Sequence, residues 1–167
     1  VETGDLWWLR QDRDKLEELG FNMIEFSVTG MDYRQVKEKL KNIDVIFVSG
    51  GNSFYLLNQT IKSGFDKVLQ EIGDSLIYIG SSAGSALVGN GIGKLDNLDD
   101  ASKAPDLKSD GLKLIDLAIL PHWGSQEFQE GYRESFEKLY KEDYKIILIT
   151  NRQYLFVEGE TYKLIQA

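Results

Sequence analysis

Apolar residues along the chain form two patterns, short apolar runs and stretches with helical spacing. Several runs are almost continuous and rich in β-branched residues, which is typical of strands covered on both faces of a parallel sheet. The runs predict strands at residues 22–28, 43–48, 75–79, 114–120 and 145–149. Two last runs, 154–157 and 162–165, flank a Glu-Gly-Glu turn and predict a β-hairpin.

Helical spacing separates these runs. Apolar residues three or four positions apart, together with capping residues, predict helices at 5–19, 32–41, 53–63, 65–72 and 126–141, and one more after Gly84. Asp5 is the candidate N-cap of the first helix, and Gly20 can end it. Residues 89–111 are rich in Gly, Asp and Lys and predict a long surface loop that could contain a turn of helix, a kind of segment that is often functional.

The alternation of strands and helices predicts an α/β fold. We expect a three-layer, doubly wound, mostly parallel sheet with helices on both faces and a C-terminal hairpin. The chain contains no repeat, low-complexity tract or boundary signal, so residues 1–167 are expected to form a single domain. In such sheets the ligand site lies beyond the carboxyl ends of the strands.

Composition narrows the chemistry. The 167 residues include no Cys and one His, His122, which excludes a disulfide framework, a cysteine nucleophile and multi-histidine metal sites, so no metal or cofactor is expected. The net charge of −8 argues against nucleic acid and anionic membranes as partners. No apolar run reaches the roughly 20 residues of a membrane span, and no signal-peptide pattern opens the chain. We therefore expect a cytoplasmic protein.

The strongest motif follows the apolar run 75–79. Gly80-Ser81-Ser82-Ala83-Gly84 fits the G-x-S-x-G pattern of a nucleophile elbow, and it lies between a predicted strand and a predicted helix, as that motif requires. Ser82 would project above the sheet at a helix N-terminus. The alternative is a turn of small residues that packs the helix tightly against the sheet, and Ser81 is a weaker candidate.

Two other strand ends carry candidate groups. The turn at Gly50-Gly51-Asn52-Ser53 could offer backbone N–H groups to an anion or an oxyanion, or it could simply be a glycine turn. His122 follows the run 114–120 and is the one imidazole that could serve as base for a serine. The group that would orient His122 is left open by the sequence: the candidates are Asp96, Asp99, Asp100 and Asn151.

At these residues the chain resembles the peptidase E (aspartyl dipeptidase) family. Three blocks match in order: Val48-Ser49-Gly50-Gly51-Asn52-Ser53-Phe54, Tyr78-Ile79-Gly80-Ser81-Ser82-Ala83-Gly84-Ser85 and Ile119-Leu120-Pro121-His122. The loop at Leu98-Asp99-Asp100 and the terminal Thr150-Asn151-Arg152-Gln153 also look like the family, so the likeness runs from about Asn22 to the C-terminus.

The resemblance implies a class I glutamine-amidotransferase-like (flavodoxin-like) fold and a Ser–His peptidase. Ser82 would be the nucleophile, His122 the base, and the amides of Ala83 and of Gly50 or Gly51 the oxyanion hole. Asp100 is our choice for the third catalytic member, with Asp99, Asp96 or Asn151 as alternatives. Asn52 and Arg133 are the candidates for substrate binding, Arg133 because members that cleave after an N-terminal Asp need a cation for its carboxylate. Alternatively, Arg133 is a solvated helix residue that pairs with Glu130 or Glu137.

The chain departs from the family in two places. The family begins with another strand ahead of what is here Val1, and its loss would expose an apolar edge, which a homodimer is one way to cover. Relatives with a Glu as third catalytic member would place it near Asn151, and an amide orients an imidazole without offsetting its charge. The expected function is a serine peptidase acting on short peptides, with N-terminal Asp peptides as the expected class. The alternatives are a binding module with little turnover and an esterase or amidase.

Overall fold

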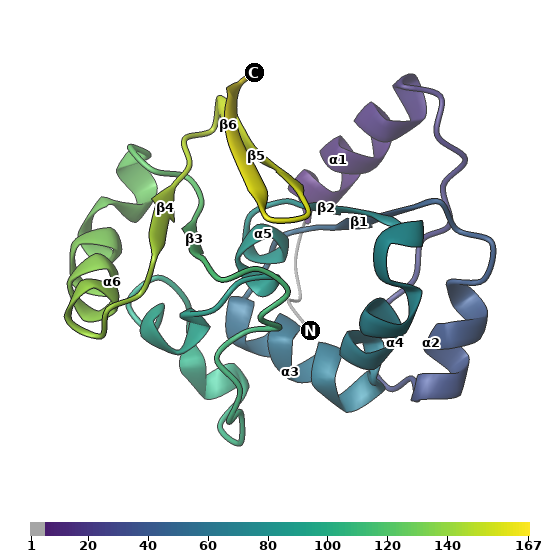
Figure 1. Ribbon diagram of the computed structural model, residues 1–167, viewed down its shortest axis with the longest axis horizontal. Coiled ribbons are helices and arrows are strands. Elements are labelled where there is room, and N and C mark those ends of the chain that lie inside the picture. Colours follow the sequence, from purple (N-terminus) through teal and green to yellow (C-terminus); the bar gives the residue numbers. More distant parts are fainter. Residues whose placement is uncertain (1–5) are drawn as a thin grey trace.

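The computed structural model describes residues 6–167, apart from the side chain of Asp74, and its strands pair two by two (Figure 1). β1 (Val45–Val48) lies parallel to β2 (Ile77–Gly80), and β3 (Ala118–Leu120) lies parallel to β4 (Ile146–Leu148). β5 (Gln153–Glu158) and β6 (Thr161–Gln166) form the antiparallel hairpin. The α/β class with parallel inner strands is confirmed, but the strands form three separate ladders rather than one continuous sheet.

The helices follow the predicted pattern closely. They are α1 (Trp7–Glu18), α2 (Tyr33–Lys39), α3 (Ser53–Ser63), α4 (Phe65–Ile72), α5 (Ala83–Leu87) and α6 (Gln129–Lys141). α6 is preceded by the 3-10 turn η4 (Gln126–Phe128), and a second such turn, η1 (Gly73–Ser75), follows α4. The N-cap of α1 is Leu6. The predicted cap, Asp5, lies outside the described residues. Within those residues, no helix is both long and apolar enough to cross a membrane.

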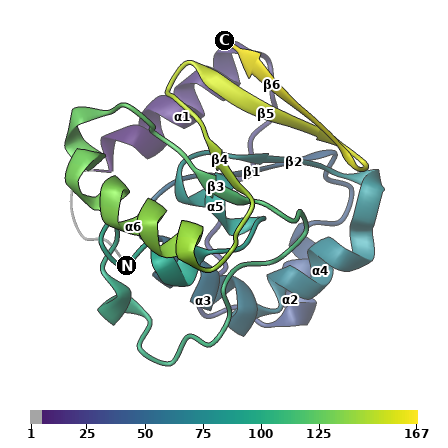
Figure 2. The same cartoon turned by 60° about the vertical axis from the view of Figure 1, so that its left-hand side comes forward.

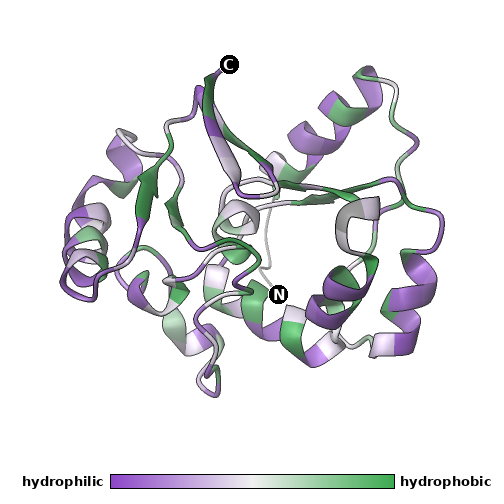
Figure 3. Cartoon of the chain, viewed as in Figure 1, coloured by the Kyte–Doolittle hydropathy of each residue, from purple (hydrophilic) through white to green (hydrophobic). Residues whose placement is uncertain are grey.

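The layers follow from where the apolar side chains point. α2, α3 and α4 lie on one side of β1 and β2, whereas α1 and the hairpin lie on the other (Figures 1 and 2). One buried cluster joins α3, α5 and α6 to β3, and a second joins α2 and α4 to β1. In Figure 3 most of α1 is hydrophilic, whereas α4 carries hydrophobic as well as hydrophilic residues. Accordingly, α1 buries none of its described side chains.

The strand predicted at 22–28 is wrong. The segment has no regular secondary structure, and within residues 6–167 no strand pairs with it. Ile24 is 61% exposed and Phe26 is 36% exposed. β-Branched and aromatic residues favour a strand only where a neighbour supplies the ladder and a surface to pack on, and both are missing here. For the same reason β2 forms as predicted but is not covered on both faces, since Ile77 is 62% exposed.

The prediction of a surface loop at 89–111 is only half right. Two 3-10 turns, η2 (Ile92–Lys94) and η3 (Ala101–Lys103), interrupt it, and Ile92, Leu95 and Ala104 are buried in the first cluster. These apolar residues are too far apart to form a periodic pattern, but together they anchor the loop. The loop is therefore part of the core.

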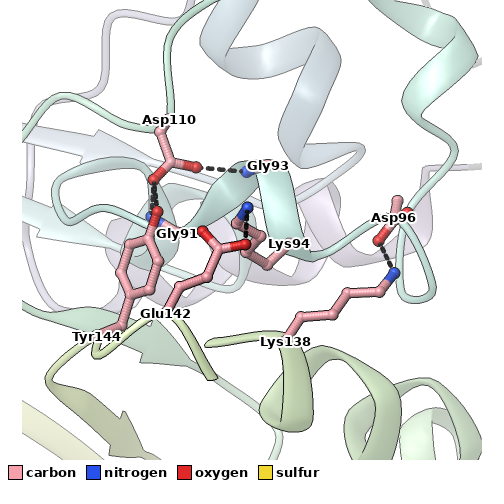
Figure 4. A network of polar contacts seen from close by, with 8 residues as sticks. All are labelled: Gly91, Gly93, Lys94, Asp96, Asp110, Lys138, Glu142 and Tyr144. Carbon is pink, nitrogen blue, oxygen red and sulfur yellow. Dashed lines mark hydrogen bonds and ion pairs between the residues drawn. The ribbon is translucent and has the colours of Figure 1, made fainter. Parts of the chain in front are cut away.

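One carboxylate organises the start and the end of this loop. Asp110 accepts hydrogen bonds from the amides of Gly91 (2.9 Å) and Gly93 (2.8 Å) and from the Tyr144 hydroxyl at 2.5 Å (Figure 4). The hydrogen bond to Asp110, aided by burial, raises the pKa of Tyr144 to about 12. Two ion pairs, Lys94–Glu142 and Lys138–Asp96, each with a nitrogen–oxygen distance of 2.6 Å, connect the same loop to α6 and its end (Figure 4).

Candidate active site

The turn between β2 and α5 has the geometry of a nucleophile elbow. Ser82 has φ 54° and ψ −119°, a conformation that residues with side chains rarely adopt. A Cβ on Gly80 would lie 2.4 Å from the carbonyl oxygen of Gly84, and one on Gly84 would lie 2.1 Å from that of Val48. Both glycines are therefore required by close backbone contacts, and they leave Ser82 at the tip of the turn.

Two hydroxyls brace this turn. The Tyr78 hydroxyl donates to the carbonyl oxygen of Gly84 at 2.8 Å, and burial raises the pKa of Tyr78. Ser85 donates to the carbonyl oxygen of Ser82 at 2.6 Å. The first bond ties α5 to β2 and the second closes the first turn of α5, and together they help to offset the strained backbone of Ser82.

The glycine turn after β1 lies directly against the elbow. A Cβ on Gly50 would come within 2.9 Å of the Ser82 Cβ and 3.3 Å of its Oγ, so only glycine fits beside the serine. Gly51 has φ 122°, which also favours glycine. Within residues 6–167, the amides of Gly50, Gly51 and Ala83 have no protein acceptor. The structure thus places Gly50 and Ala83 beside Ser82, with Gly51 next to Gly50 in the same turn.

His122 meets Ser82 from the end of β3. Its Nε2 lies 2.8 Å from Ser82 Oγ, a hydrogen-bond distance. The imidazole is half-buried and its residue has φ 63°, so the chain turns sharply just after the strand. The two residues that the sequence singled out for proton transfer are therefore brought together, although 40 positions separate them.

Asn151 occupies the position behind the imidazole. Its Oδ1 lies 2.7 Å from His122 Nδ1, at the turn between β4 and β5. A carboxamide oxygen only accepts, so this contact assigns the proton to Nδ1 and leaves the Nε2 lone pair facing the serine. Asn151, one of the alternatives for the third member, is the group that the structure places there.

The choice of Asp100 as third member is not supported by the structure. Asp100 accepts from the amide of Ser102 and caps η3, and hydrogen bonding by Ser102, first through its side chain and then through its amide, lowers the pKa of Asp100. Asp99 accepts from the amide of Ser53 at 2.9 Å, at the start of α3, and Asp96 pairs with Lys138. The loop that carries all three is fixed against α3 and α6, and so none of these carboxylates bonds to His122.

The side chain of Asn52 is hydrogen-bonded to other parts of the protein. Its Oδ1 caps α3 by accepting from the amide of Tyr55 at 2.8 Å, and its Nδ2 donates to the carbonyl oxygen of Asp100 at 3.0 Å. Both ends of the amide predicted to bind substrate are already engaged within the protein. Together with Asp99, Asn52 secures the glycine turn to the long loop.

Arg133 does not reach the serine and the histidine. It is exposed on α6, where it lines a shallow depression that consists of α6 side chains alone: Glu130, Arg133, Glu134, Glu137, Lys138 and Lys141. The pKa of Glu137 is lowered mainly by its hydrogen bond to Lys141, and the charge of Arg133 adds to this effect. The helical periodicity that buries Tyr132 directs Arg133 toward solvent, which agrees with the alternative of a solvated helix arginine.

The sequence did not reveal one neighbour of the site. Phe128, at the end of η4, stacks on the imidazole of His122 with ring centroids 5.1 Å apart and planes inclined by 18°. In the sequence it looks like part of the apolar stripe of the following helix. The ring of Phe128 faces the imidazole because the chain reverses direction after His122, which the sequence does not show.

Metal ligands are not gathered at this site. In the part of the chain that the structure describes, no group of three or more His, Cys, Asp and Glu side chains could hold a metal ion. The groups brought together at the site are the Ser82 hydroxyl, the His122 imidazole and the Asn151 carboxamide.

Known proteins resemble the chain over almost all its length. The model of Peptidase family S51 matches residues 3–165. The uncharacterized peptidase Lmo0363 of Listeria monocytogenes is 31% identical over 156 residues, which cover 92% of this chain and 76% of that protein. Peptidase E of Streptomyces coelicolor is 28% identical over 144 residues, covering 78% and 58% of the two chains.

A solved structure shares the fold. The crystal structure of a Listeria monocytogenes protein assigned to peptidase E superposes with a TM-score of 0.88 at 30% identity, and the match covers all of this chain and 81% of that one. This likeness confirms the glutamine-amidotransferase-like class of the fold and the resemblance that the motifs indicated. The family is one of peptidases, and the chain belongs to peptidase family S51.

Proposed function

We propose that the chain is a serine-type peptidase in which Ser82 is the nucleophile, His122 the general base and Asn151 the group that orients the imidazole. The observation that carries this proposal is the chain of two hydrogen bonds, 2.8 Å from Ser82 Oγ to His122 Nε2 and 2.7 Å from His122 Nδ1 to Asn151 Oδ1. This arrangement corresponds to the roles in a Ser-His-Asp triad, with an amide in place of the carboxylate.

The reaction would proceed by acyl transfer. His122 takes the proton of Ser82 as its Oγ attacks the peptide carbonyl, and the carbonyl oxygen becomes an oxyanion. The amides of Ala83 and of Gly50 or Gly51 would donate to that oxyanion. The imidazolium then gives its proton to the leaving amine, and water, activated by the same histidine, hydrolyses the acyl-enzyme.

We further propose that the substrates are short peptides, with peptides that begin with Asp as the first class to test, and that the protein works in the cytoplasm. The support for this substrate class is the resemblance to proteins named peptidase E. Arg133, the cation that the sequence offered for the substrate carboxylate, lies among glutamates and lysines of α6, so we do not include it in the proposed site. An ester or another amide is the competing substrate class, because G-x-S-x-G turns also serve esterases.

The test is labelling by a fluorophosphonate, followed by mass mapping. We expect the label on Ser82 in the native chain, no label in Ser82→Ala, and native labelling in Ser81→Ala, the matched control one position away. Hydrolysis of the best substrate should fall by about 10⁴-fold or more in Ser82→Ala. A folded native chain that takes up no label would overturn the serine mechanism and favour a binding module.

The substrate is tested separately. A panel of Asp-Leu, Glu-Leu, Ala-Leu, N-acetyl-Asp-Leu and a simple aryl ester distinguishes the proposed specificity from an esterase. Preference for Asp-Leu over Ala-Leu, lost when the amino group is acetylated, would support cleavage after an N-terminal Asp. Equal rates on the first three peptides would contradict that specificity without affecting the assignment of Ser82.

A further inference from the structure

The chain after β3 folds back so that a second ring covers the imidazole. The carbonyl oxygen of His122 accepts from the amide of Ser125 at 3.0 Å, and that of Ser125 accepts from the amide of Phe128 at 3.3 Å. Gly124, with φ 83°, lies within the first of these turns. Two consecutive turns thus bring Phe128 back over His122, and the rings stack at 5.1 Å.

The stacked ring is itself held in place. Phe128 is half-buried and packs against the first hydrophobic cluster. It contacts Tyr132 edge-to-face at 6.2 Å, and Tyr132 in turn contacts Trp123 at 5.5 Å. Because Tyr132 is only 5% exposed, this row of rings connects the imidazole to the core.

The imidazole needs this support. Its hydrogen bonds to Ser82 and Asn151 are made by its two nitrogens, so they act at the edge of the ring and not on its faces. A ring stacked on one face, inclined by 18°, limits how far the imidazole can turn about its bond to Cβ. The face of an aromatic ring also attracts a cation, so it favours the imidazolium that forms when His122 takes the serine proton. The neutral amide of Asn151 cannot offset that charge.

We propose that Phe128 is a positioning residue that fixes the plane of His122 and thereby the activity of Ser82. The inference rests on the proposed serine mechanism. Phe128 does not touch the hydroxyl; it acts through the imidazole.

The experiment compares Phe128→Leu with Phe128→Tyr, which keeps an aromatic ring, and with Phe136→Leu, a matched loss of a half-buried ring two turns later on α6. We expect the rate of fluorophosphonate labelling at Ser82 to fall about 10-fold or more in Phe128→Leu, since small misplacements of a catalytic group are costly. It should stay near the native rate in the other two variants. Thermal unfolding measures the structural cost of each variant.

The single histidine supplies a second readout. In an NMR spectrum of chain labelled at His, the ring protons of His122 should carry the upfield shift caused by a stacked aromatic ring. That shift should persist in Phe128→Tyr and Phe136→Leu and disappear in Phe128→Leu. The inference would be overturned if the fluorophosphonate labelled Ser82 at the native rate in Phe128→Leu, or if Phe136→Leu slowed this labelling as much as Phe128→Leu does. If the fluorophosphonate did not label Ser82 in the native chain, the serine mechanism itself would be refuted. In that case the NMR spectrum would still test the stacking, which an upfield shift unchanged by Phe128→Leu would refute.

Discussion

The two halves of the candidate site are built by different means. The serine half is fixed by backbone contacts: Gly84 lies so close to the carbonyl oxygen of Val48 that a methyl group would come within 2.1 Å of it, and Ser82 has no freedom to be elsewhere. The imidazole half depends on side chains. His122 accepts a hydrogen bond from Ser82, donates one to Asn151, and is stacked on the ring of Phe128.

The difference predicts how each half fails. A steric constraint within buried backbone is lost only when the local fold is lost, so replacing a closely packed glycine of the serine half should reduce stability and activity together. Side-chain contacts at the edge of the site can be removed one at a time, since Asn151 is exposed. Changes in the imidazole half should therefore reduce activity while the chain remains folded.

The largest effect is expected from Gly84→Ala. Its new Cβ would meet the backbone of Val48 and Ser49, which cannot yield without separating α5 from β1. We expect the free energy of unfolding to fall by about 3 kcal/mol or more, in the range of severe overpacking. The measurement is urea unfolding followed by circular dichroism.

Gly20→Ala is the control for this variant. Gly20 has φ 89° but open space around its Cβ, so alanine meets a backbone penalty of about 1 kcal/mol without a clash. If the two variants lost equal stability, steric contact at the elbow would not be what fixes the serine half.

Asn151→Ala tests the other half. Removing the acceptor leaves Nδ1 without its partner and frees the tautomer, so we expect labelling at Ser82 and peptide hydrolysis to fall by about 10²-fold or more, with little change in unfolding. Arg152→Ala, at the next exposed position, is the matched control. The comparison fails if Asn151→Ala unfolds the chain as readily as Gly84→Ala does.

Asn151→Asp tests whether a charged acceptor supports His122 better than the amide does. A carboxylate would accept from Nδ1 in a charge-assisted hydrogen bond and would offset the imidazolium charge. We expect faster labelling of Ser82 than in the native chain, measured under the same conditions. A slower rate would show that the neutral amide is the better partner in this site.

These two halves were not equally predictable from the sequence. The elbow was predicted by the Gly80–Gly84 spacing after an apolar run, because a local motif contains the whole steric argument. The partner of His122 was not, because Asp96, Asp99, Asp100 and Asn151 are all polar residues in loops and only tertiary packing selects among them. The acidic loop looked solvated, whereas Ile92 and Leu95 anchor it in the core and turn its carboxylates toward α3 and α6.

The same reasoning explains where the fold departed from the pattern. Helices such as α3 and α4 have their hydrogen bonds and caps within their own sequence, so their predicted ends were met. A strand depends on a partner that its own residues do not specify. Residues 22–28 have strand-forming composition, yet within the described chain they remain unpaired.

A smaller effect is expected from Asp99→Ala, which tests whether the long loop belongs with the serine half. The variant removes the acceptor for the amide of Ser53 at the start of α3, beside the glycine turn. Losing a helix-capping carboxylate costs about 1 kcal/mol of unfolding free energy. Asp100→Ala, whose side chain caps only η3, should cost less, and neither should reduce labelling as Asn151→Ala does. A rate loss of 10²-fold in Asp99→Ala or Asp100→Ala would restore that residue as the partner of His122.

The smallest expected effect on stability is that of the hydrogen bond between Asp110 and Tyr144, which connects the two halves of the site. Asp110 joins the loop that follows α5, through Gly91 and Gly93, to Tyr144, which precedes β4 and hence Asn151. The hydrogen bond to Asp110 raises the pKa of Tyr144 to about 12 from its ordinary value near 10. Because the folded pKa is the higher one, the stabilisation is complete below about pH 10 and is lost as the pH rises through about 12.

Unfolding of the native chain and of Tyr144→Phe, compared at pH 8 and at pH 11.5, measures this link. At pH 8 we expect the native chain to be more stable than Tyr144→Phe by about 1 kcal/mol, the usual net contribution of one hydrogen bond. The difference should shrink at pH 11.5, because the phenolate and the carboxylate of Asp110 repel each other. A difference that does not change with pH would show that Tyr144 contributes through packing alone, and the two halves would then be joined by the core rather than by this hydrogen bond.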